Sequence, residues 1–317
     1  MQAALVVILT VFVGLLVVLE IGLRTVGFGN PLIYVADEQI GYLLAPNQRT
    51  RRFGNRIKVN EYSMRGEPIQ KTPLSSTLRV LLLGDSIANG GWWTDQAKTI
   101  SSLMAQELSA AIKSKFTEAE VLNASANSWG PRNELAYLLR FGNFNAQVVV
   151  LLINTDDLFA TAPTSLPVGR DRNYPNQKPP LALVEAFYRY VSKQKPIPEM
   201  KVVNDEGGDR IGFNLEAIGK IQTLARQANS QFLLVMTPLL REIGEPGPRD
   251  YEIKARQRLN EFVQSQGITY IDFLPVFNSN KDIKTVYQDN IHLNLQGNQI
   301  VSEVISQAVL ELLEYEN

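Results

Sequence analysis

Hydrophobic positions divide the chain into an apolar N-terminal run and a longer part where short apolar runs alternate with amphipathic stretches. Five short runs have the length and the β-branched content of strands. They cover residues 79–83, 120–124, 147–153, 231–237 and 269–272. The continuous apolar run at 148–153 is typical of a strand that is buried on both faces of a sheet.

Amphipathic stretches separate these runs and predict helices. They cover residues 100–113, 133–141, 215–228, 251–266 and 295–313. Within one of them, Ile218, Ile221 and Ala225 recur at spacings of three and four residues, which places them on one helix face. The alternation of strands and helices predicts an α/β protein, a three-layer α/β/α sandwich around a central parallel sheet of about five strands.

The first apolar run, residues 3–23, is interrupted only by Thr10, Gly14, Glu20 and Gly22. About 20 apolar residues suffice to cross the roughly 30 Å hydrocarbon core of a bilayer. The run is long for a signal peptide, no basic residue precedes it, and no clear cleavage site follows. We therefore expect residues 1–24 to form a single-pass transmembrane anchor, with an uncleaved signal sequence as the alternative. The charges beside the run leave the side of the membrane open.

Two segments interrupt the α/β pattern. Residues 25–77 are rich in Gly, Pro, Asn and Arg, and they predict either a stalk or a packed N-terminal extension. The α/β domain is expected to occupy residues 78–317. Within it, residues 161–212 contain seven prolines, which exclude long helices except over 181–192. We interpret this stretch as an insertion of the kind that forms a lid or a binding loop.

The amino-acid composition excludes several kinds of site and partner. The chain has no cysteine, which excludes disulfides, thiol catalysis and thiolate metal sites. Its one histidine, His292, makes a zinc site unexpected, so we predict neither a metal nor a cofactor. A net charge of −1 argues against a nucleic-acid partner, which needs a basic face. Any mechanism that requires an imidazole therefore has a single candidate.

The first candidate catalytic residue, Ser86, follows the first predicted strand in the sequence Gly84-Asp85-Ser86. Active sites of parallel sheets form beyond the carboxyl ends of the strands. A serine hydroxyl needs an adjacent base, and that base needs an acceptor on its other ring nitrogen. His292 can supply the base, and Asp289 lies three residues earlier in a predicted turn. We predict a triad of these three side chains; a serine in an ordinary turn and a helix-capping histidine are the alternatives.

With these motifs the chain resembles the SGNH, or GDSL, hydrolase family from about residue 78 to the C-terminus. The Gly-Asp-Ser that ends at Ser86 and the Asp-x-x-His of Asp289 and His292 match two family motifs. Residues 123–130 are similar to the second family motif, and residues 154–157 to the third. The resemblance implies the family's fold and ester hydrolysis through an acyl-enzyme, with no cofactor.

The resemblance also implies an oxyanion hole. Its backbone donors would be the N–H groups of Ser86 and Ser128, or of Gly130 in a shifted alignment. Asp156 occupies the place of the family's asparagine donor, and an ionised carboxylate only accepts hydrogen bonds. Losing one such donor costs roughly 10²–10³ in rate. We expect Asn154, on the same side of the strand, to supply the amide; protonation of Asp156 and loss of activity are the alternatives.

The tryptophans lie close in sequence to the predicted site. We expect Trp92, Trp129 and the carboxyl of Asp156 to contact substrate, the rings forming a platform for a sugar or an acyl chain; core packing or a membrane-interface position is the alternative. The favoured function is a serine esterase acting on an acyl ester, such as an O-acetyl ester, of a small molecule or a glycan. One alternative is an O-acyltransferase acting on an envelope polysaccharide. Another is a catalytically degenerate, membrane-anchored binding or assembly protein.

Overall fold

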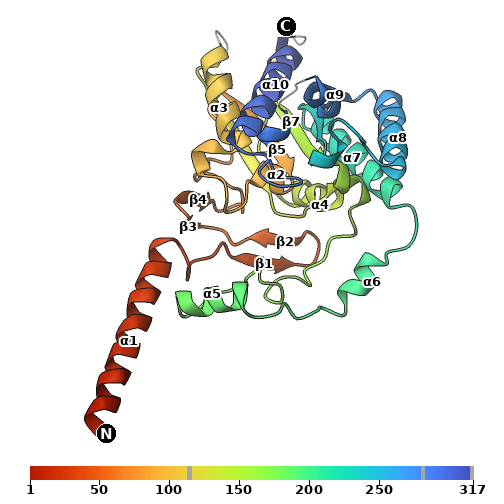
Figure 1. The fold of residues 1–317 in the computed structure, drawn as a ribbon. Coiled ribbons are helices and arrows are strands. Elements are labelled where there is room, and N and C mark those ends of the chain that lie inside the picture. Colours follow the sequence, from red (N-terminus) through yellow and green to blue (C-terminus); the bar gives the residue numbers. More distant parts are fainter. Residues whose placement is uncertain (113–115, 280–282, 315–317) are drawn as a thin grey trace.

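A computed structural model describes residues 1–112, 116–279 and 283–314. Its centre is a parallel five-stranded sheet with the order β6-β5-β7-β8-β9 (Figure 1). The strands are β5 (Thr77–Gly84), β6 (Glu118–Ser125), β7 (Val148–Asn154), β8 (Gln231–Thr237) and β9 (Thr269–Asp272). Because β6 and β7 lie on opposite sides of β5, the order in which successive strands are added reverses there, and such a switch point is where ligands bind in open α/β sheets.

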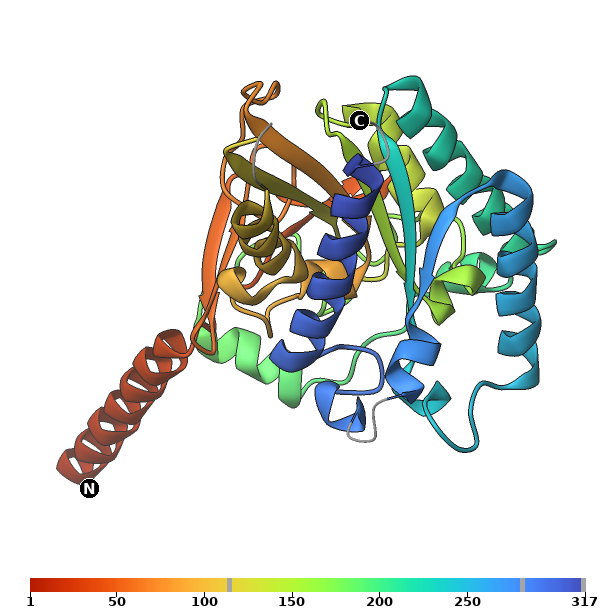
Figure 2. The same ribbon diagram turned by 90° about the horizontal axis from the view of Figure 1, so that it is seen from above.

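Helices cover both faces of the sheet (Figures 1 and 2). One face carries α3 (Ile100–Ala111), α9 (Phe273–Asn278) and α10 (Leu295–Glu314). The other carries α4 (Pro131–Phe141), α7 (Arg210–Gln227) and α8 (Asp250–Gln266). Alternate strand residues feed the two cores: Val80 and Leu82 belong to the first, Leu81 and Leu83 to the second. The predicted three-layer α/β/α sandwich is confirmed.

The predicted elements differ from the observed ones mainly at their ends. Two strands, β8 and β9, have the predicted bounds. Helix α4 starts two residues early because Pro131 fits its first turn. Helix α7 starts five residues early, where the Asp209 side chain accepts a hydrogen bond from the N–H of Gly212 at 3.0 Å. The predicted end of α3 at residue 113 lies outside the described residues.

The N-terminal region consists of one long helix and two antiparallel hairpins. Helix α1 (Gln2–Thr25) buries no residue and is a candidate membrane span, although a signal sequence would have the same features. The hairpins are β1 (Tyr34–Asp37) with β2 (Gly41–Leu44), and β3 (Gln48–Arg52) with β4 (Asn55–Val59). Ile40, Leu44 and Ile57 are buried in the same core as the central sheet. The segment between α1 and β5 is therefore folded onto the domain rather than extended.

The Pro-rich insertion leaves the sheet after β7 and returns at α7. It contains two short helices, α5 (Ala182–Tyr190) and α6 (Met200–Asn204), joined by irregular chain. Figure 1 shows α5 beside the hairpins and next to the end of α1. The remaining short elements are α2 (Ser86–Asn89), η1 (Gln96–Lys98), η2 (Thr155–Phe159), η3 (Leu240–Glu242) and η4 (Ile283–Val286).

Candidate active site

The turn between β5 and α2 presents the hydroxyl of Ser86 at the switch point of the sheet. Gly84 ends the strand where a Cβ atom would lie 2.6 Å from the carbonyl oxygen of Leu152, so only glycine fits. Asp85 caps the next helix, because its Oδ1 accepts a hydrogen bond from the N–H of Ile87 at 2.8 Å. Ser86 is therefore the first residue of α2, directly beyond the carboxyl end of β5.

The three predicted catalytic side chains lie in one hydrogen-bonded row. Nε2 of His292 is 2.9 Å from Oγ of Ser86, and Nδ1 of His292 is 2.7 Å from Oδ2 of Asp289. The other oxygen of Asp289 accepts the N–H groups of Ile291 and His292 at 2.9 and 2.8 Å. The turn just before α10 thus aims the imidazole at the serine, across 206 residues of sequence.

The surroundings of Asp289 favour one tautomer of His292. Burial raises the pKa of Asp289, but the hydrogen bonds from the backbone and ring of His292 and from Ile291 outweigh it, so the net pKa is below its usual value. An ionised carboxylate at Nδ1 holds the proton on that nitrogen and leaves the lone pair of Nε2 for the serine. This arrangement suits general-base chemistry at Ser86.

Trp93 lies beside the imidazole of His292, a contact that the order of residues in the chain does not predict. The centroid of its ring lies 4.4 Å from that of His292. An aromatic ring at this distance limits how far the imidazole can turn. Its place soon after the Gly-Asp-Ser motif, next to Trp92, was the available signal.

Two backbone N–H groups are available beside the serine. Ser86 and Ser128 line the same cavity, and within the described ranges neither N–H donates to another protein group. Ser128 has a φ of 59°, in the left-handed region that favours glycine. Tyr174 donates to its Oγ at 2.9 Å, which helps to hold this conformation.

The expected oxyanion contact from Asn154 needs correction. Its Nδ2 donates to Oδ2 of Asp85 at 2.8 Å and to Oδ2 of Asp157 at 3.0 Å. A side-chain amide has two hydrogens, and both are directed to carboxyl groups, so none is free for a substrate oxygen. Asn154 instead joins the ends of β5 and β7. The position of Asn154 in the sequence indicated on which side of the strand it lies. It did not indicate that two carboxyl groups would accept the hydrogen bonds of its amide.

Buried carboxyl groups form the floor of the site. Burial raises the pKa of Asp85, and it raises those of Asp157 and Glu134 well above their usual values. Both oxygens of Glu134 lack a hydrogen-bond partner among the residues described. Burial therefore disfavours the charged form of each of these carboxyl groups.

Asp156, the residue expected to contact substrate, is among the residues that line the cavity. Its backbone N–H donates to Oδ1 of Asn154 at 2.8 Å, and the residue is exposed to solvent. Burial raises the pKa of Asp156, while the nearby Arg241 opposes this shift. The pKa of Asp156 therefore lies above that of an unperturbed aspartate.

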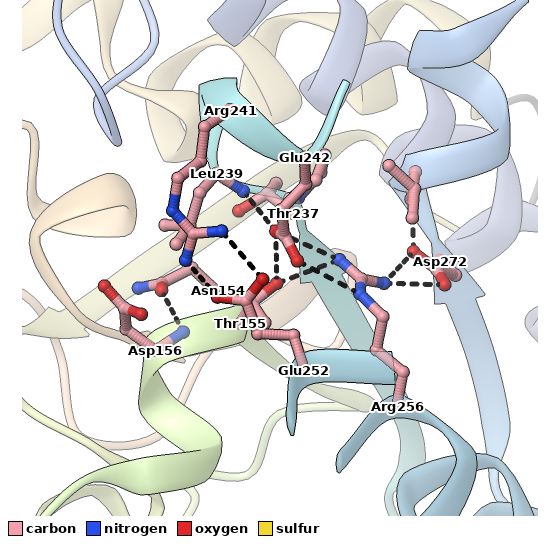
Figure 3. Close-up of polar contacts among 12 residues, drawn as sticks. Asn154, Thr155, Asp156, Thr237, Leu239, Arg241, Glu242, Glu252, Arg256 and Asp272 are labelled. Atoms are coloured by element: carbon pink, nitrogen blue, oxygen red, sulfur yellow. Dashed lines mark hydrogen bonds and ion pairs between the residues drawn. The ribbon is translucent and has the colours of Figure 1, made fainter. Parts of the chain in front are cut away.

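A network of buried charges holds η2 under the cavity (Figure 3). Nη2 of Arg256 donates to Oγ1 of Thr155 at 2.8 Å, and Thr155 donates to Oε2 of Glu242 at 2.7 Å. Nη1 of the same arginine contacts both oxygens of Asp272 at 2.8 and 2.9 Å. The network joins η2, η3, α8 and β9, and its members are too far apart in sequence to form a motif.

The site opens into a cavity of about 770 Å³ with aromatic walls. The hairpins contribute Tyr34 and Tyr42, the insertion contributes Tyr174, and these ring centroids lie 5.1–5.9 Å apart. Trp92 lines the cavity and is 36% exposed, so its ring is accessible from the cavity. Trp129 also reaches the lining but is 1% exposed, and its Nε1 donates to the carbonyl of Tyr42 at 3.0 Å. Its contacts are those of a core residue, so the packing alternative describes Trp129 better.

Arg65 fastens the N-terminal region to the loop that follows α2. Its buried guanidinium donates to the carbonyl of Gly91 at 2.6 Å and to those of Asn89 and Thr94. This loop carries Trp92 and leads to η1. Over the described part of the chain, no cluster of His, Asp and Glu suits a metal ion.

Comparison with known proteins identifies the family. The sequence profile of the GDSL-like lipase/acylhydrolase family matches residues 82–300. Similar solved structures include an acetyl xylan esterase (16% identity, 73% of this chain and 99% of that chain, TM-score 0.47). Others are a catalytic mutant of an acetylxylan esterase from Geobacillus stearothermophilus (12%, 74% and 94%, TM-score 0.47) and a lipase/acylhydrolase from Enterococcus faecalis (14%, 73% and 94%, TM-score 0.44). No curated protein matches the sequence. Because the profile match spans more than half of the chain, this protein belongs to the GDSL-like lipase/acylhydrolase family and is an ester-hydrolysing enzyme.

Proposed function

We propose that the protein is a membrane-anchored serine esterase that works through a Ser86–His292–Asp289 triad and an acyl-enzyme. The observation that carries this proposal is the 2.9 Å contact between Oγ of Ser86 and the only imidazole of the chain. Residues 1–24 form the anchor, 25–77 an extension, and 78–317 the catalytic domain with its insertion at 161–212. The apolar α1 supports the anchor.

The reaction proceeds in two steps, the formation of an acyl-enzyme and its hydrolysis. Oγ of Ser86 attacks the carbonyl carbon of the ester while its proton passes to Nε2 of His292. The N–H groups of Ser86 and Ser128 hold the oxyanion, and the tetrahedral intermediate collapses as His292 protonates the leaving alcohol. Water then attacks the acyl-enzyme, His292 takes its proton and returns it to Oγ, and the carboxylic acid leaves.

The cavity favours an acyl ester carried on a ring. Trp92 and Tyr174, which are partly exposed in the cavity, offer flat apolar faces against which a sugar packs. The substrate we propose is therefore a short acyl ester, such as an O-acetyl ester, of a small molecule or a glycan. No cofactor takes part.

An O-acyltransferase would use the same triad, with a sugar hydroxyl in place of water. We expect hydrolysis to dominate: an acetylated xylo-oligosaccharide incubated with an unacetylated glycan should release its acetyl groups as free acetate. Acetate is measured enzymatically, and the acceptor is examined by mass spectrometry. Faster release in the presence of acceptor, together with an acetylated acceptor, would establish transfer instead.

Asp156→Asn is expected to increase kcat by about tenfold or more, because a charge that repels the oxyanion becomes an amide that can donate to it. Asp156 is neutral below its raised pKa and anionic above it. The ratio of variant to wild-type kcat should therefore grow as the pH rises through that pKa.

Rates of short-chain ester hydrolysis between pH 5 and 9 test this expectation. The matched control is Asp205→Asn, which makes the same change at an exposed position. A ratio that stays at or below one across the range would show that the Asp156 carboxylate does not oppose the reaction.

A further inference from the structure

Helix α5 has its charged side inward and its apolar side in solvent. Glu185 faces the domain, where its Oε1 lies 2.6 Å from Nη2 of Arg52 and its Oε2 accepts the N–H of Gly29 at 2.7 Å. The outward residues are apolar or aromatic and 54–68% exposed: Phe187, Tyr188, Tyr190 and Val191. In water a surface helix has the opposite arrangement, so this face indicates a partner other than water.

The helix is attached to the end of the candidate membrane span. Oε1 and Oε2 of Glu20 in α1 accept the N–H groups of Ala182 and Leu183, each at 2.9 Å. Arg24 bonds to Glu20 at 2.7 Å and to the carbonyl of Pro180 at 3.3 Å. Figures 1 and 2 both show α5 beside the C-terminal end of α1. The first turn of α5 therefore has a fixed position relative to α1.

The length of α1 puts this junction at the edge of a bilayer. Glu20 is 18 residues beyond Gln2, which is about 27 Å along a helix axis, and the hydrocarbon core is roughly 30 Å thick. The start of α5 then lies where acyl chains meet headgroups. Two exposed lysines, Lys193 and Lys195, follow the helix directly and suit anionic headgroups.

We propose that α5 is an interfacial helix whose outer face lies in the headgroup layer of the membrane that holds α1. The proposal rests on the membrane anchoring that belongs to the proposed function. Arg189 of α5 also lines the cavity, so a membrane-bound α5 holds the active site close to the bilayer surface. An ester displayed at that surface is then the class of substrate within reach.

The absence of native cysteine allows a direct test with single labels. The full chain carrying Tyr188→Cys or Val191→Cys is labelled with the fluorophore NBD. It is then reconstituted into vesicles of phosphatidylcholine and phosphatidylglycerol. The control is Leu74→Cys, at an apolar position that is 63% exposed. Leu74 precedes the amino end of β5, whereas Ser86 follows its carboxyl end. Flotation of the vesicles after a carbonate wash reports separately on the anchor.

We expect labels at 188 and 191 to shift to shorter emission wavelengths and to be quenched at least about twofold by lipids with a nitroxide near the headgroup. The label at 74 should show neither effect. Chains that float while all three labels respond alike would overturn the α5 proposal and leave the anchor intact. Chains that do not float would overturn both.

Discussion

Ser86→Ala is expected to lower kcat for ester hydrolysis by about 10⁴-fold or more, since the residual activity of enzymes without their nucleophile reflects only binding and the oxyanion hole. Oγ of Ser86 lies 2.9 Å from Nε2 of His292, and the substitution removes this oxygen. Initial rates with a short-chain p-nitrophenyl ester measure the loss. Labelling with a fluorophosphonate probe should disappear with it.

The control for this prediction is Ser265→Ala, which removes an exposed serine hydroxyl at the end of α8. It should retain full turnover and labelling. Thermal unfolding of both variants should match the wild type, because a buried serine in a short helix contributes little to stability. Undiminished labelling of Ser86→Ala would mean that another residue is the nucleophile, and the triad would then be wrong.

Arg256→Met is expected to lower the free energy of unfolding by about 3–5 kcal/mol, because it leaves buried carboxylates without their cation. Glu242 is fully buried, and Asp272 forms two hydrogen bonds to the same guanidinium. Urea unfolding in a mild detergent, followed by tryptophan fluorescence, measures the change. Turnover should also fall, because Thr155 loses the donor that holds η2.

The same helix provides the matched control. Arg258 lies two residues further along α8 and pairs with Asp209 at 2.5 Å, but both side chains are largely exposed. Exposed ion pairs contribute about 0–1 kcal/mol, so Arg258→Met should change stability little. Equal losses in the two variants would show that the buried network is no stronger than a surface pair.

The sheet and the proximity of Ser86, His292 and Asp289 were predictable because their signals are local. Apolar runs such as 148–153 define buried strands without knowledge of their neighbours. Ser86 follows the first of these strands, and Asp289 reaches His292 within a single turn. A chain with one imidazole leaves no competing pairing.

The cavity walls were not predictable, because they depend on contacts between distant segments. Tyr42 donates to the carbonyl of Asn127, 85 residues away, and Arg65 reaches Gly91 from a segment without periodicity. Asn154 shows the same limit. Its place at the end of a predicted strand put it on the correct side of the sheet, but the carboxyl that accepts from its amide is that of Asp85, which follows a different strand.

Under the proposed anchoring, the hairpins connect the membrane attachment to the cavity. Residues 26–59 both follow α1 and supply Tyr34, Tyr42 and Arg52 to the cavity. A protease that cut directly after α1 would liberate a working catalyst. A cut further along, within β1 (Tyr34–Asp37) or β2 (Gly41–Leu44), would liberate one whose substrate chamber has lost a wall. Shedding and inactivation are thus separated by only a short length of polypeptide.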